Sequence, residues 1–153
     1  MKIEIENGKL AVAINFLYGL KLARKQSRFR RHFIKLMQDR LKQVEEDRKE
    51  LLQEHSHKDE EGKAIVKPDG NYDVKDMVAF SNDVKELNSE KLIIEGGDNR
   101  EMIRTIKVVL KKLEDQEYEG QDSEIYDYLA DQFDIDNENE KTENEGEEEN
   151  DAN

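Results

Sequence analysis

The stretch that decides the fold runs from Ser27 to His55, SRFRRHFIKLMQDRLKQVEEDRKELLQEH, and it contains neither glycine nor proline. At about 100° per residue, its apolar side chains fall on one side of a helical wheel; they are Phe29, Phe33, Leu36, Met37, Val44 and Leu51. The spacing predicts one long amphipathic helix of roughly eight turns, about 40 Å from end to end. Because its second half carries many charges and few apolar residues, we expect that half to project toward solvent.

Shorter elements are expected on both sides of this helix. Ile3 and Ile5 alternate with charged residues, which predicts a short N-terminal strand. A Pro68-Asp69-Gly70 turn signal lies between two apolar runs, and it predicts a small β-hairpin within 62–76. Apolar residues at helical spacing predict amphipathic helices over 9–20, 77–90, 98–113 and 123–133, with a short extended piece at 92–94. Asp98 and Glu101 have the spacing of a capping box for the 98–113 helix.

Composition divides the chain into two parts. Charged residues make up 41% of its 153 residues and hydrophobic ones 35%, so the core must be small. Ten acids and one base fall within 134–153 and account for −9 of the net charge of −13. We therefore expect a single folded domain over 1–133, followed by a disordered acidic tail over 134–153. The predicted fold class is α+β and predominantly α-helical.

Enzyme signatures are scarce. Without cysteine the chain forms no disulfide and no thiolate metal site. His55 and His57 lie next to acids, but nothing in the sequence defines a complete ligand set, and no nucleophile elbow or phosphate-binding loop is present. We predict no enzyme activity, no cofactor, no metal and no catalytic residue. Met1 to Glu6 lacks the apolar stretch of a signal peptide, and the apolar run Leu10–Leu17 is too short to span a bilayer, so we expect a cytoplasmic protein without a membrane partner.

Two cationic stripes are the most informative surface feature. From Lys21 to Lys42 the sequence has nine bases and one acid, Asp39. Spacings of three and four residues place two sets of bases opposite the apolar stripes of two helices. The candidate binding residues are Arg24, Arg28, Arg31 and Lys35 on the long helix, and Arg100, Arg104, Lys107 and Lys111 on the helix after Gly97.

Three interpretations of the stripes remain open. They are the ordinary polar side of amphipathic helices, or a surface that the acidic tail covers until a partner displaces it. In the third interpretation they contact nucleic acid through its phosphates. Base stacking is not supported, since Phe29 and Phe33 are expected to face the core.

Four segments carry a resemblance to a known family: Lys2–Leu10, Lys25–Arg31, Asp59–Lys63 and Glu124–Leu129. Over about residues 1–133 the chain resembles a family of small uncharacterised proteins encoded by tailed phages and prophages of Gram-positive bacteria. The resemblance implies a phage-encoded accessory protein made in the cytoplasm of the bacterial host, and it supplies no functional residues.

These observations lead to one functional expectation and one alternative. We expect a non-enzymatic protein that binds another protein, either a phage assembly component or a host factor that it modulates. The alternative is a nucleic-acid-binding regulator that uses both cationic stripes. The sequence does not predict an oligomeric state.

Overall fold

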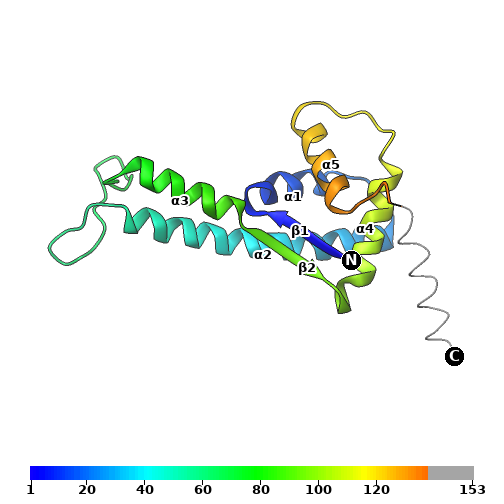
Figure 1. Cartoon of the computed structure of the whole chain (residues 1–153), viewed down its shortest axis with the longest axis horizontal. Helices are drawn as coiled ribbons and strands as arrows, with labels where there is room; N and C mark the ends of the chain where they lie inside the picture. The colour runs from blue at the N-terminus through cyan, green and yellow to red at the C-terminus, as the bar shows by residue number, and fades with distance from the viewer. Residues whose placement is uncertain (138–153) are drawn as a thin grey trace.

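The structure of the chain is a computed structural model that describes residues 1–137. In chain order the helices, strands and 3-10 turns (η) are β1 (Lys2–Glu6), η1 (Asn7–Lys9), α1 (Leu10–Tyr18), α2 (Arg24–Glu54), α3 (Met77–Ser89), β2 (Lys91–Glu95), η2 (Gly97–Asn99), α4 (Arg100–Lys112) and α5 (Gly120–Gln132). The mainly helical α+β architecture is the predicted one (Figure 1). Apart from its first four residues, the acidic tail predicted for 134–153 lies outside the described residues.

The first half of α2 packs with α1, α4, α5 and the two strands into a body that holds the core. β1 pairs with β2 in antiparallel register, with Ile3 opposite Ile94 and Ile5 opposite Leu92. Since side chains alternate along a strand, these four residues share the face of the sheet that packs into the body. The bulkiest fully buried side chains are Phe33 and Phe133, whose rings meet edge to face with centroids 5.6 Å apart.

The second half of α2 leaves the body and runs beside α3, so the two helices form an arm (Figure 1). The predicted projection of this half is therefore observed, but α3 covers one side of it. Val44, Phe80 and Leu87 are buried in the arm, a much smaller apolar set than in the body. Asp76 begins α3 by accepting a 3.0 Å hydrogen bond from the backbone N–H of Ala79, as an N-cap does.

Residues 55–76 form the tip of the arm, where the chain makes two loops. Three extended segments bond to one another in a closed ring: His57 N–H donates to Asp73, Asp73 N–H to Ile65, and Ile65 N–H to His57, at 2.9, 2.9 and 2.8 Å. Val66 pairs with Tyr72 across the predicted Pro68–Asn71 turn. The predicted hairpin is thus present as a minimal pair of bridged segments, joined by a third segment at 56–58.

Asn7 joins the arm to the body. It is 3% exposed, its backbone N–H donates to Glu90 at 2.8 Å, and its side-chain amide donates to the carbonyl of Leu87 at 2.8 Å. The guanidinium of Arg40 donates to the Asn7 amide oxygen at 2.9 Å. One buried asparagine in η1, directly after β1, therefore bonds to both helices of the arm, and its polar groups are satisfied.

Two local predictions differ from the structure. The capping box of Asp98 and Glu101 is wrong, because Gly97–Asn99 form a 3-10 turn and α4 begins at Arg100 without a side-chain cap. Gly96 and Gly97 both adopt positive φ there and turn the chain toward α4. Beyond α5, Ile135 is 7% exposed and belongs to the core, so ordered packing reaches two residues past the predicted end of the domain.

Candidate functional site

The two predicted cationic stripes lie on α2 and α4, which pack against each other in the body. Arg24, Arg28, Arg31 and Lys35 are exposed along the first three turns of α2. On α4, Arg100 and Lys111 are exposed, and Arg104 and Lys107 are half-buried. Phe29 and Phe33 were both expected to face the core. Phe33 is fully buried, whereas Phe29 is only half-buried.

The stripes meet where the start of α2 approaches the start of α4, and Glu101 lies at the junction. The ammonium group of Lys25 is 2.9 Å from the Glu101 carboxylate. This hydrogen bond, with the positive charges of Lys25, Arg28 and Arg104, holds the pKa of Glu101 below its usual value. Bases from two helices that are more than seventy residues apart in sequence thus act on one carboxylate.

An open hollow lies beside this junction, which we call the basic hollow. It is lined by three bases and two acids from α2, η2 and α4, together with uncharged residues: Lys25, Arg100, Arg104, Asp98, Glu101, Gly97, Thr105 and Val108. Arg28 does not line the hollow, but its positive charge acts on Glu101, which does. The structure therefore brings together Arg28, Arg100 and Arg104 of the eight candidate residues.

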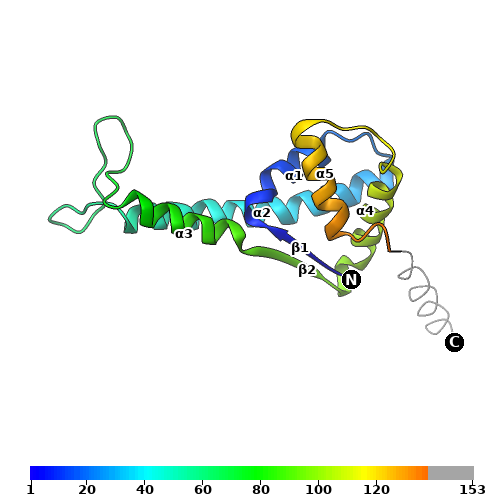
Figure 2. The ribbon, with the colours of Figure 1, turned by 45° about the horizontal axis from the view of Figure 1, so that its top comes forward.

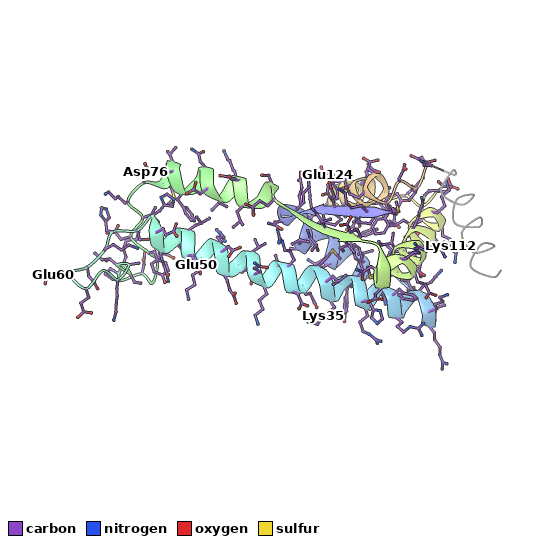
Figure 3. All side chains as sticks on the ribbon, turned by 60° about the horizontal axis from the view of Figure 1, so that its bottom comes forward. Lys35, Glu50, Glu60, Asp76, Lys112 and Glu124 are labelled. Carbon is purple, nitrogen blue, oxygen red and sulfur yellow. The ribbon has the colours of Figure 1, made fainter. Side chains whose placement is uncertain are left out.

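Six of the eight candidates do not line the hollow: Arg24, Arg28, Arg31, Lys35, Lys107 and Lys111. Lys35 pairs with Asp39 at 2.6 Å, and Lys111 pairs with Glu114 at 2.9 Å. Figure 3 shows Lys35 on the underside of α2, well separated from Lys112 at the end of α4. The stripes are thus continuous with the hollow only at their N-terminal ends.

Two bases of the basic segment are structural. The guanidinium of Arg30 donates to the carbonyls of Leu17 (3.2 Å) and Leu20, at the end of α1 and just beyond it. Arg40 bonds Asn7 and lies 3.5 Å from the carbonyl of Lys91. Counting charge along the sequence cannot separate such bases from surface ones, because each of them looks like part of the same cationic run.

A second surface feature, an acidic groove, lies between the two helices of the arm. Three acids of α2 face two of α3 and Glu90, which directly follows α3, with one leucine from each helix: Asp47, Glu50, Glu54, Asp83, Glu86, Glu90, Leu51 and Leu87. Sequence reasoning missed this groove because its two sides are separated by the tip loops. The sequence does show that 45–54 and 83–90 are both rich in acids. Only the structure shows that these two stretches lie side by side.

The acidic groove does not form a metal site. Within residues 1–137, no group of three or more histidine, aspartate or glutamate side chains is arranged to hold a metal ion. His55, considered above as a metal ligand, instead lies 2.5 Å from the Asp83 carboxylate, and its ring packs edge to face on Phe80. These contacts connect the end of α2 to α3.

Comparison with known proteins finds no match among protein-family models, curated proteins or solved structures. In the described part of the chain, none of the helices combines the length and the apolar character needed to cross a bilayer.

Proposed function

We propose that this chain is a non-enzymatic binding protein that recognises another protein through the basic hollow and the adjoining α2 stripe. The observation that carries the proposal is the separation of charge over the molecule. Bases from α2 and α4 gather around Glu101 at one end, and six carboxylates line the groove of the arm. Opposed potentials on one molecule favour oriented encounter with a partner of complementary charge.

The composition of the hollow favours a protein over nucleic acid as the partner. Asp98 and Glu101 lie among its bases, and two carboxylates repel closely spaced phosphates. A protein surface presents both signs of charge, so it can pair its acids with Arg28 and Arg100 while its bases approach Glu101.

The resemblance to phage-encoded proteins suggests where the protein is made and which partners it binds. We infer a phage accessory protein made in the cytoplasm of the bacterial host, where it binds either a phage assembly component or a host factor. The long arm would give the small body a second contact with such a partner, because an elongated element extends its reach (Figure 1).

A charge-reversal pair on one helix tests the proposal. Arg28→Glu changes a base of the α2 stripe whose charge acts on Glu101 of the hollow, and Lys42→Glu makes the same charge change farther along exposed α2 surface. In affinity capture from infected cells, we expect Arg28→Glu to lose the partner and Lys42→Glu to retain it, with both variants unfolding at nearly the wild-type temperature. Equal capture by the two variants would contradict binding through the α2 stripe where it adjoins the hollow.

Nucleic acid is the second candidate, and the nine bases between Lys21 and Lys42 favour it. Binding through phosphates requires affinity that falls steeply as salt is added. A gel shift across a salt series, with wild type and Arg28→Glu in parallel, distinguishes the candidates. If the partner is a protein, we expect no nucleic-acid gel shift that weakens as salt is added.

A further inference from the structure

Strand β2 has an open edge. Its sheet has two strands, and β1 lies between β2 and α5, so one edge of β2 is the margin of the sheet (Figure 2). The outer edge of β1 is partly closed, because the backbone N–H of Glu6 donates to the Tyr128 hydroxyl at 2.9 Å. Within residues 1–137 no strand lies on the other side of β2, although Arg40 reaches the carbonyl of its first residue, Lys91.

The register shows which backbone groups of β2 point away from β1. Bonded and non-bonded pairs alternate in an antiparallel ladder, and the 2.8 Å bond from Asn7 to Glu90 continues the β1–β2 register. Bonded pairs are therefore Ile5 with Leu92 and Ile3 with Ile94. The N–H and C=O groups of Lys91, Ile93 and Glu95 then point outward, and Arg40, which reaches the Lys91 carbonyl from α2, agrees with this direction.

The side chains of the same three residues form the solvent face of β2. Lys91 and Glu95 are exposed, and Ile93 is 54% exposed although it is a large apolar residue in a strand. The Lys91 ammonium also lies 3.4 Å from the Glu4 carboxylate of β1 on this face. The strand reads Lys-Leu-Ile-Ile-Glu, so its two ends carry opposite charges equally spaced about Ile93. When two copies of this strand lie antiparallel, Lys91 of each therefore faces Glu95 of the other.

We propose that β2 pairs antiparallel with β2 of a second copy of this chain, in a two-fold contact centred on Ile93. In that register Ile93 lies opposite Ile93 of the other copy, and Lys91 lies opposite Glu95 twice. The three outward residues supply the donors and acceptors of the new ladder, and the pairing joins two sheets into one of four strands. Arg40, beside the Lys91 carbonyl, places a second positive charge near the incoming Glu95.

The charges on β2 indicate that the strand pairing with its edge comes from a second copy of the chain. Charged residues on an edge strand ordinarily oppose strand addition. Here the two signs are placed so that one register with a second copy pairs every charge favourably, while a shift by two residues sets Lys91 or Glu95 against an uncharged residue. Burial of two Ile93 side chains adds apolar contact in the same register. None of the three outward residues of β2 lines the basic hollow.

A mixing experiment with full-length protein tests the register. Lys91→Glu gives a strand with two acids, and Glu95→Lys gives a strand with two bases, so each variant alone opposes like charges. By analytical ultracentrifugation from about 1 µM to about 1 mM, we expect wild type to show a monomer–dimer equilibrium. Each single variant should weaken dimerisation by roughly tenfold or more, and an equimolar mixture of the two should restore a dimer containing one copy of each.

A second pair of variants tests the backbone contact. Ile93→Pro removes an outward-pointing N–H without removing a bond to β1, so we expect it to abolish dimerisation, whereas Ile93→Val should retain it. Thermal unfolding reports whether each variant is folded. The proposal is wrong if wild type stays monomeric at about 1 mM. It is also wrong if a folded Ile93→Pro still dimerises, or if the mixed charge variants associate no better than either alone.

Discussion

At the scale of single residues, Tyr126 is a buried polar group whose titration is tied to folding. Its hydroxyl donates a 2.7 Å hydrogen bond to the Leu110 carbonyl at the end of α4. Burial, with a smaller contribution from Glu114, raises the pKa of Tyr126 to about 12. A group with a raised folded-state pKa contributes stability that is fully present below its ordinary pKa and lost as the pH rises toward the raised value.

We therefore expect Tyr126→Phe to change the pH dependence of stability above pH 10, the ordinary value. Near pH 7 the free energy of unfolding of the variant should be about 1 kcal/mol lower than that of the wild type, because the hydrogen bond to Leu110 is lost. Between pH 10 and about 12 the wild type should lose stability and the variant should lose less, so that the two converge. Urea denaturation at neutral and alkaline pH measures both effects. Tyr18→Phe, at a position 77% exposed, is the control and should leave the curve unchanged.

At the scale of elements, Arg30 shows how one helix completes another. It donates to the carbonyl of Leu17 in the last turn of α1, where a helix leaves acceptors without intrahelical partners, and to the carbonyl of Leu20 just beyond the helix. Arg31, its neighbour on α2, is exposed and has no such contact. We expect Arg30→Ala to lower the free energy of unfolding by about 1–3 kcal/mol. Arg31→Ala should change it by less than about 0.5 kcal/mol. Equal losses in chemical denaturation would contradict this assignment.

The acidic groove makes the contact between α2 and α3 sensitive to salt. Six carboxylates face one another there, and like charges at short range oppose helix pairing. We expect Glu86→Gln to raise the melting temperature at low ionic strength by the equivalent of a few tenths of a kcal/mol, with the gain disappearing near 1 M salt. Glu45→Gln, on α2 outside the groove, is the matched control. A gain that persists at high salt would show that charge repulsion is not its cause.

Elements with strong local periodicity could be predicted, and their pairings could not. The stripe from Phe33 to Val44 predicts α2, and the alternation of Ile3 and Ile5 predicts β1, because each pattern lies within a few turns or residues. The pairing of β1 with β2 joins residues almost ninety positions apart, and no local pattern encodes it. The junction at Glu101 was missed for the same reason, since Lys25 and Glu101 meet only after α2 packs on α4.

At the scale of the whole molecule, the body and the arm differ in how much apolar surface they bury. The core cluster lies almost entirely in the body, while the arm depends on a narrow seam that includes Val44, Phe80 and Leu87. Segments with few buried apolar contacts open at lower free energy than the core. We expect amide hydrogen exchange in α3 and in α2 beyond Val44 to be faster than in α4, by roughly tenfold or more. Uniform protection along α2 would contradict this division.

The closed ring of hydrogen bonds at the tip has a consequence for how the molecule tolerates change. His57, Ile65 and Asp73 bond one another in a cycle, and the loops between them turn at Gly62 and Gly70, each with positive φ and open space around it. Lengthening either loop leaves the cycle intact and adds only a small closure entropy. Epitope tags, fluorophores or whole peptides inserted at these glycines should therefore be carried at the far end of the molecule without disturbing its packing.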